Sequence, residues 1–157
     1  MTPAINFAKK AGIDFKVHQY SHDADAPSYG LEAAQKLGLP AQQVFKTLMV
    51  QDETQALAVA VVPVQGQLNL KKMARALCVK KVQMADKTLA ERSSGYVLGG
   101  ISPLGQKKSL PTVIDAQAGD FATIFVSAGR RGLEIELSAA DLATLTRARF
   151  ADIAQIG

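Results

Sequence analysis

The sequence predicts an α+β fold, a single domain over residues 1–157 in which helices flank a mixed, curved, barrel-like β-sheet. Stretches typical of strands dominate the centre of the chain, and those typical of helices lie at its flanks. Of the 157 residues, 48% are hydrophobic and 20% charged, which suffices to bury one core. No GxGxxG motif opens a helix after a strand, which argues against a doubly wound dinucleotide-binding sheet.

Two helices are expected near the start of the chain. Thr2 supplies an N-cap and Pro3 a first-turn residue for a helix that ends at Gly12. Residues 28–37 predict a second helix, which Gly38 closes.

Three strands accompany these helices. FKVHQY (15–20) alternates apolar and polar residues, as a half-buried strand does. KTLMVQD (46–52) and ALAVAVVPV (56–64) predict a hairpin that turns at DETQ. Because the second of these is apolar on both faces, we expect it at the centre of the sheet.

The middle of the chain predicts helix, strand and helix in turn. Asn69 caps a helix that runs to about Leu77, and KKVQMA (80–85) is expected to be a strand. Asp86 then caps a short helix that ends before Gly95.

The last third of the chain is expected to be mostly strand. Ser138 and Asp141 form a capping box for a final long helix. AGRRG (128–132) predicts the turn between two strands. The expected strands are YVLGG (96–100), TVIDA (112–116), DFATIFVS (120–127), LEIEL (133–137) and ARFADI (148–153).

Composition limits the compartment and the partners. No apolar run is long enough to span a membrane, and residues 1–12 do not resemble a signal peptide, so we expect a cytoplasmic protein without a membrane partner. The single cysteine, Cys78, excludes an internal disulfide, and we expect it to pack inertly on a helix. The net charge of +4 permits an anionic partner, although paired lysines and arginines are more often simply a solvated surface.

Standard catalytic signatures are absent from the sequence. There is no Gly-x-Ser-x-Gly elbow, HExxH, P-loop or CxxC motif. His22, Asp23 and Asp25 lie close together, but residues of this kind in a polar segment indicate a turn rather than a zinc site. His18 is expected to pack on its strand, and we expect neither a metal nor a cofactor.

Two features carry possible chemistry. Strand alternation places Lys46 on the same face as Leu48 and Val50, where its stem covers apolar surface or its ammonium stabilises an anion in a pocket. The loop GGISPLGQKK (99–108) is either a wide turn that needs positive φ angles or a surface whose exposed N–H groups bind an oxygen that gains charge. Spacing alone favours the first interpretation of Lys46, a stem that covers apolar surface, and does not choose between the two interpretations of the loop.

Several separated segments resemble a known family. They are FKTLMV, LNLKK, KKVQMAD, SSGYVLGGISPLGQKK and IFVSAGRRGLEIEL, and they are similar to bacterial YbaK-type Cys-tRNA(Pro) deacylases over nearly the whole chain. The resemblance implies a metal-independent trans-editing enzyme that hydrolyses cysteine wrongly attached to proline tRNA. It also implies a relation to the editing domain of bacterial prolyl-tRNA synthetases, and association with that synthetase.

The resemblance also implies roles for individual residues. Activity depends on Lys46, with the Gly99 and Gly100 backbone as the other catalytic element. The substrate-binding positions are Tyr20, Tyr29, Thr47, Ile101, Ser127 and Glu134. Tyr29 stands where phenylalanine is frequent, Glu134 where aspartate is frequent, and AGRRG replaces the usual GGKRG.

The implied mechanism needs no nucleophile from the protein. A cysteinyl ester carries its own thiol, with a pKa of about 8.5, and its thiolate can attack the ester carbonyl. We expect the tRNA acceptor end to meet the protein with phosphate contacts at Lys107, Lys108 and Arg130. There are two alternatives. The enzyme removes alanine or serine instead of cysteine, or the protein is a non-catalytic module that binds tRNA ends or a synthetase.

Overall fold

The computed structural model describes residues 1–23 and 29–156. Its helices are α1 (Pro3–Ala11), α2 (Tyr29–Leu37), α3 (Leu70–Leu77), α4 (Lys87–Ser94), the 3-10 helix η1 (Ala116–Asp120) and α5 (Ala139–Thr146). Its strands are β1 (Lys16–Gln19), β2 (Phe45–Asp52), β3 (Leu57–Pro63), β4 (Gly66–Leu68), β5 (Val82–Met84), β6 (Thr112–Asp115), β7 (Ile124–Arg130), β8 (Leu133–Leu137), β9 (Arg149–Ala151) and β10 (Ala154–Ile156).

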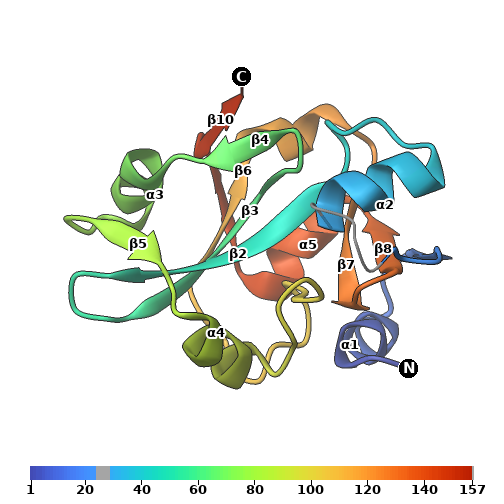
Figure 1. Cartoon of the computed structure of the whole chain (residues 1–157), viewed down its shortest axis with the longest axis horizontal. Coiled ribbons are helices and arrows are strands. Elements are labelled where there is room, and N and C mark those ends of the chain that lie inside the picture. Colours follow the sequence, from blue (N-terminus) through green and yellow to red (C-terminus); the bar gives the residue numbers. More distant parts are fainter. Residues whose placement is uncertain (24–28, 157) are drawn as a thin grey trace.

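The largest sheet is mixed, with the strand order β5-β2-β3-β6-β9. In this sheet β2 pairs antiparallel with both β3 and β5, whereas β6 is parallel to β3 and to β9. A second sheet has the order β1-β8-β7, and β10 pairs with β4. A parallel bridge between Val44 and Phe125 links the residue before β2 to β7, so the strands curve around the core without closing (Figure 1).

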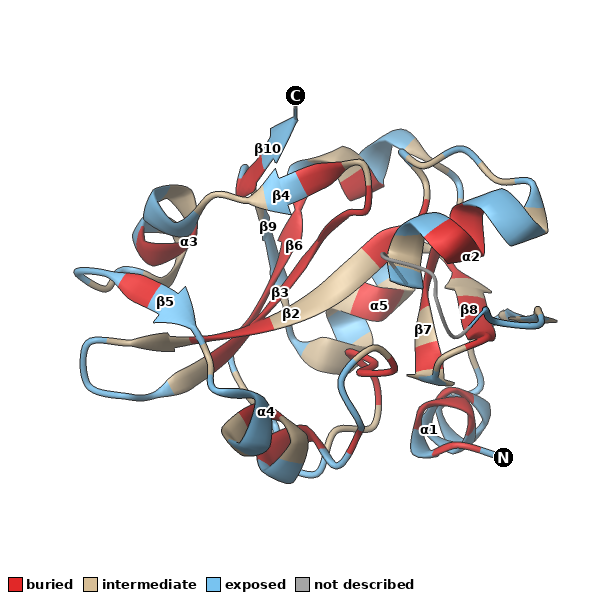
Figure 2. Ribbon diagram, in the orientation of Figure 1, coloured by how far each residue is buried: buried red, intermediate tan, exposed pale blue. Residues whose placement is uncertain are grey.

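The predicted α+β class and the mixed, curved sheet are confirmed. The hydroxyl of Thr2 and the side chains of Asn69, Asp86 and Ser138 each accept the backbone N–H three residues ahead, which caps α1, α3, α4 and α5. Strand β3 is third in the five-stranded order and is buried over most of its length, as its apolar sequence predicts (Figure 2).

Several expected boundaries are wrong. Residues 96–100 form a turn and not a strand, because Gly95 and Gly99 have φ angles of 84° and 93°. Residues 120–127 contain the end of η1 before β7 starts, and the strand expected at 148–153 is limited to β9. Helix α5 has only eight residues, and the short pair β4 and β10 was not expected because three-residue strands leave little periodicity.

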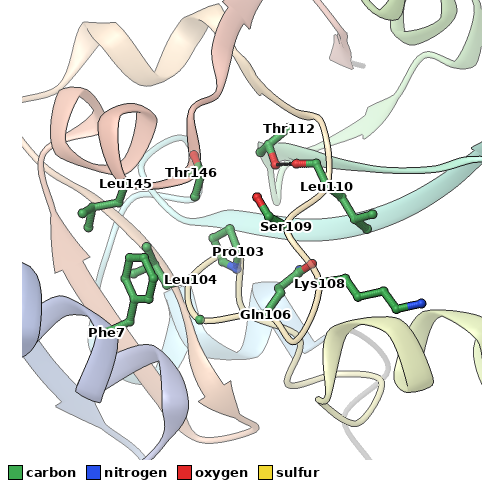
Figure 3. A pocket seen from close by; sticks show the side chains of 11 residues that line it. Phe7, Pro103, Leu104, Gln106, Lys108, Ser109, Leu110, Thr112, Leu145 and Thr146 are labelled. Carbon is green, nitrogen blue, oxygen red and sulfur yellow. Dashed lines mark hydrogen bonds between the residues drawn. The ribbon is translucent and has the colours of Figure 1, made fainter.

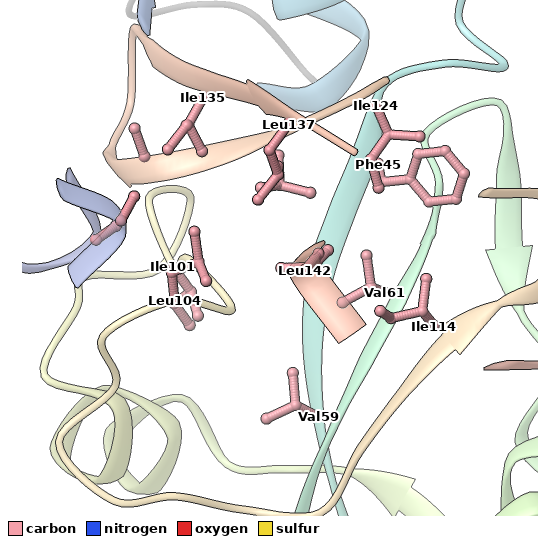
Figure 4. Packing of buried hydrophobic residues seen from close by; sticks show 14 of the residues in the cluster. Phe45, Val59, Val61, Ile101, Leu104, Ile114, Ile124, Ile135, Leu137 and Leu142 are labelled. Atoms are coloured by element: carbon pink, nitrogen blue, oxygen red, sulfur yellow. The ribbon is translucent and has the colours of Figure 1, made fainter. Parts of the chain in front are cut away.

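Strand β2 buries its two faces against different groups of residues. Phe45 and Met49 belong to the main core, which also contains residues from α1, α5, β7 and β8 (Figure 4). Leu48 and Val50 face the other way and pack in a second cluster, which contains Met73 of α3. The alternation predicted for this strand therefore holds, and it places Lys46 on the α3 side of the sheet.

A buried carboxylate fixes the end of the chain. Asp115, at the end of β6, is 1% exposed. One of its oxygens accepts the backbone N–H groups of Ile153 and Ala154, both at 3.0 Å, and the other accepts two N–H groups of Gln117 at 2.9 and 3.2 Å. These bonds compensate the desolvation of the carboxylate and attach β10 to the sheet.

We expect Asp115→Ala to lower the free energy of unfolding by about 3 kcal/mol, because several buried N–H groups lose a charged acceptor. Urea denaturation measures this change. Asp120→Ala is the matched control, since Asp120 is exposed at the far end of η1. Equal effects of the two substitutions would contradict the proposed role of Asp115.

Candidate functional site

A cavity of about 280 Å³ is lined by residues from the start of β2, helix α2, the loop around Gly99 and the sheet that contains β7 and β8. Figure 1 shows where these elements lie in the fold. The cavity is lined by Tyr20, Tyr29, Gly30, Phe45, Lys46, Thr47, Leu48, Leu98, Gly99, Ile101, Ser127 and Glu134. All but one of the residues predicted as catalytic or substrate-binding lie here, and Gly100 is the exception. Gly30, Phe45, Leu48 and Leu98 were not predicted, although Phe45 and Leu48 follow from their position beside Lys46 on β2.

Lys46 supplies the cationic group of this cavity. It is partly buried, and burial lowers the pKa of its ammonium below the usual value. Within residues 1–23 and 29–156, no carboxylate lies within 4.0 Å of its nitrogen. A partly desolvated ammonium without an acidic partner favours binding of an oxygen that carries or gains negative charge.

Two hydroxyl groups provide further polar contacts. The Thr47 Oγ1 atom is buried and has no hydrogen-bond partner within the described part of the chain. Ser127 Oγ accepts the N–H of Gly129 at 3.1 Å, which holds the serine at the bulge of β7. An unpaired buried hydroxyl at a cavity wall is available to a bound ligand.

The cavity also contains a carboxyl group that burial keeps protonated. Glu134 is 7% exposed, and burial raises its pKa to about 8. The pKa of Tyr20 is raised to about 12, mainly by burial and secondly by the negative charge that Glu134 carries when it is ionised. At neutral pH both groups are therefore mainly neutral hydrogen-bond donors, so neither opposes negative charge that develops near Lys46.

The first two glycines of the loop serve different purposes. Gly99 has a φ of 93°, and a Cβ atom there would lie 2.5 Å from the Tyr29 ring, so only glycine fits. Gly100 is buried, and a Cβ there would lie 2.7 Å from the Cα of Arg130. The Gly100 N–H donates to the carbonyl of Val97 at 2.9 Å. Gly100 is thus used for packing, and the structure does not present its N–H to the cavity.

A cluster around Tyr29 holds that ring beside the loop. The guanidinium of Arg131 lies 4.0 Å from the centre of the Tyr29 ring. Its Nη2 atom donates to the carbonyl of Asp23 at 2.6 Å and lies 3.5 Å from Glu32, which is 5% exposed. The cation–π contact and the ion pair join the start of α2 to the turn between β7 and β8. No sequence pattern indicated this cluster.

The predicted phosphate contacts lie outside the cavity. Lys107, Lys108 and Arg130 are exposed, and the stem of Lys107 packs beside Gly95. Lys108 borders a smaller hollow of about 80 Å³ between α1, α5 and the loop before β6, and its side chain extends away from the other lining residues (Figure 3). In that hollow the hydroxyl of Thr112 is bonded to the carbonyl of Leu110.

Three further residues were singled out from the sequence. His18 contacts the Phe125 ring edge-on and lies 2.9 Å from Glu136, in keeping with strand packing. Cys78 is exposed at the end of α3, so the expectation of inert packing is wrong. Among the residues that the structure describes, no three histidine, cysteine or acidic side chains gather as metal ligands do, and Asp25 lies outside those residues. The described helices include none long and apolar enough to cross a membrane.

Two comparisons of the sequence with known proteins find relatives of this chain. Residues 25–145 match the model of the aminoacyl-tRNA editing domain. A protein of Enterococcus faecalis, provisionally named Cys-tRNA(Pro)/Cys-tRNA(Cys) deacylase EbsC, is 36% identical over 152 residues, which cover 97% of this chain and 92% of that protein.

Solved structures share the fold. A protein described provisionally as a trans-editing enzyme for prolyl-tRNA synthetase superposes with a TM-score of 0.84 at 22% identity, covering 98% of this chain and 95% of its own. A protein described only as hypothetical gives a TM-score of 0.87 at 23% identity, covering 98% of this chain and all of the other.

The buried carboxyl predicts a pH dependence of stability. With a pKa near 8 in the folded protein against 4.5 without burial, Glu134 holds a proton that the unfolded chain has lost. The free energy of unfolding should therefore fall as pH rises from about 5 to about 8, by on the order of a few kcal/mol. In urea denaturation, the free energy of unfolding of Glu134→Gln should not fall across that pH range. If the wild type and the variant show parallel pH profiles of this free energy, the assignment is contradicted.

Proposed function

The chain belongs to the aminoacyl-tRNA editing domain family, and from this premise we propose that residues 1–157 act as one deacylase domain that hydrolyses Cys-tRNA(Pro). The observation that carries the proposal is the partly buried Lys46 ammonium beside the Gly99 loop in a cavity with neutral polar groups. Such a cavity suits an ester whose carbonyl oxygen gains charge during reaction. The deacylase activity in the name of the E. faecalis relative supports the assignment of the amino acid.

The reaction begins with the thiolate of the bound cysteine. Its sulfur attacks the ester carbonyl carbon, so a C–S bond forms and the C–O bond to the terminal ribose then breaks. The ribose oxygen leaves with a proton from solvent, which replaces the one that the thiol lost. Water then opens the resulting cyclic thioester and yields free cysteine. The substrate supplies the nucleophile, and the protein supplies position and electrostatic stabilisation.

Each part of the cavity has a role in this step. Lys46 stabilises the oxyanion, and the N–H of Gly99 is available to assist it, because no partner for that N–H exists within the described residues. The unpaired Thr47 hydroxyl and Ser127 orient the ester or the ribose. The protonated carboxyl of Glu134 donates a hydrogen bond without adding a negative charge.

The cavity walls position the terminal adenosine. Tyr29, held by Arg131, and Tyr20 offer aromatic surface, and Ile101 is a buried apolar contact. Stacking of a base on an aromatic ring contributes roughly 1–3 kcal/mol, which helps to retain a single nucleotide end.

The choice of tRNA comes from a partner. A chain of 157 residues that encloses the aminoacyl end does not also reach the distant anticodon. We assign that selection to association with prolyl-tRNA synthetase, in keeping with the description of the trans-editing neighbour, and place the reaction in the cytoplasm, where translation occurs.

The test is deacylation of Cys-, Ser- and Ala-tRNA(Pro) by the same enzyme preparation. Fit alone separates cysteine from serine by at most roughly 200-fold, because the two differ so little in size. We expect a larger ratio of kcat, with the serine ester acting as a competitive inhibitor that is released intact. Release of serine at the cysteine rate would instead indicate a nucleophile from the enzyme or water. Absence of any deacylation would leave only a binding module.

A further inference from the structure

A further hollow, of about 380 Å³, is lined by residues of α3, the turn after it and the start of β5. Figure 1 shows α3 and β5 at the end of the large sheet away from α1 and α2. We call this hollow the basic groove. It is lined by Leu70, Lys71, Ala74, Arg75, Val79, Lys80, Lys81 and Val82.

The local structure gathers four cations around this groove. Lys71 and Arg75 are four residues apart in α3 and so lie on one face of the helix, a turn from each other. The helix ends at Cys78 in the left-handed conformation, with a φ of 59°, and the chain reverses there. This reversal brings Lys80 and Lys81 to the opposite wall, just before β5.

The four cations lack acidic partners. In the described parts of the chain, none of them lies within 4.0 Å of a carboxylate, whereas the neighbouring Lys72 is paired with Asp152 at 3.0 Å. Glu53 lies close, but its carboxylate accepts the backbone N–H of Lys80 at 3.2 Å. Four cations around one hollow give it a local excess of positive charge, which Glu53 reduces without cancelling it.

The basic groove and the Lys46 cavity are connected along one strand. Val82 of the groove pairs with Asp52, six residues beyond Lys46 on β2, which corresponds to about 20 Å. The face of β2 that carries Lys46 is also the face on which α3 packs. A stacked nucleic-acid strand covers 20 Å in roughly six nucleotide steps. When the 3′ end of a tRNA occupies the cavity, the backbone of its acceptor helix therefore lies about 20 Å from Lys46, which is the distance to the basic groove.

We propose that the basic groove binds the sugar-phosphate backbone of the tRNA acceptor helix while the aminoacyl end occupies the Lys46 cavity. This inference rests on the proposed deacylase function and extends it to a surface outside the cavity. Exposed lysine and arginine side chains bind phosphates without reading sequence, so the groove contributes affinity and not the choice of tRNA. The exposed Leu70 adds an apolar contact at the edge of the groove.

The test compares two cysteinyl esters, one on an acceptor-stem minihelix and one on the trinucleotide CCA. In the variant K71Q/K80Q/K81Q, KM for the minihelix should rise about tenfold or more at low salt, with kcat within twofold. The slope of log kcat/KM against log salt should become shallower by about 2 to 3, since each lost phosphate contact removes about 0.7 on a single strand and about 0.9 on a duplex. The trinucleotide ester, which is too short to reach the groove, should be hydrolysed as by the wild type.

The matched control is K9Q/K10Q/K16Q, which removes three exposed lysines on α1 and β1 at the other end of the molecule. It should leave both substrates unaffected. If the groove variant hydrolyses the minihelix ester with wild-type kinetics, the inference is overturned. If the variant also no longer associates with the synthetase, the groove belongs to a protein partner instead. A wild-type protein that hydrolyses neither ester would instead refute the deacylase function itself.

Discussion

The structure depends on the burial of both faces of strand β2. One face packs in the main core through Phe45 and Met49, and the other packs under α3 through Leu48 and Val50. A lysine in such a strand has few ways to reach water, and Lys46 does so only where the cavity interrupts the packing. The cost of partly desolvating an ammonium is tolerated because the strand on either side is fixed by buried apolar side chains. The position of the cation is therefore set by the fold and not by a flexible loop.

The walls around Lys46 are held by close packing of backbone. Gly99 leaves room for the Tyr29 ring, Gly100 lets the loop approach the turn at Arg130, and the Arg131 guanidinium packs over the Tyr29 ring. These contacts leave little freedom for the loop to adjust. A rigid cavity suits a reaction in which the substrate brings its own nucleophile, because positioning then accounts for most of what the enzyme contributes.

Local patterns in the sequence predicted the elements that have strong local causes. Alternation in residues 46–52 identified the face of Lys46, and side-chain caps at Asn69 and Asp86 marked the starts of two helices. The strand expected at 96–100 was wrong because apolar Val97 and Leu98 are exposed in a turn, where alternation has no meaning.

Features that join distant parts of the chain left no such trace. Neither the pair of Glu32 and Arg131 nor the two bonds from Asp115 to the backbone of Ile153 and Ala154 follows from spacing. The lysine pairs were visible in the sequence, but only the reversal at Cys78 brings Lys71 together with the pair Lys80 and Lys81 at one groove. Tyr20, Thr47, Ser127 and Glu134 were predicted as neighbours through the family resemblance alone, since nothing in their own segments indicates a shared cavity.

The most direct test of the central claim is single-turnover hydrolysis of a bound cysteinyl ester by Lys46→Met. Methionine keeps most of the apolar stem and removes the charge, so binding should change little. If the ammonium stabilises the oxyanion, the rate constant at saturating enzyme should fall by roughly 100-fold or more. An unchanged rate constant with a normal dissociation constant would contradict the account, because the cation would then be only a packed side chain.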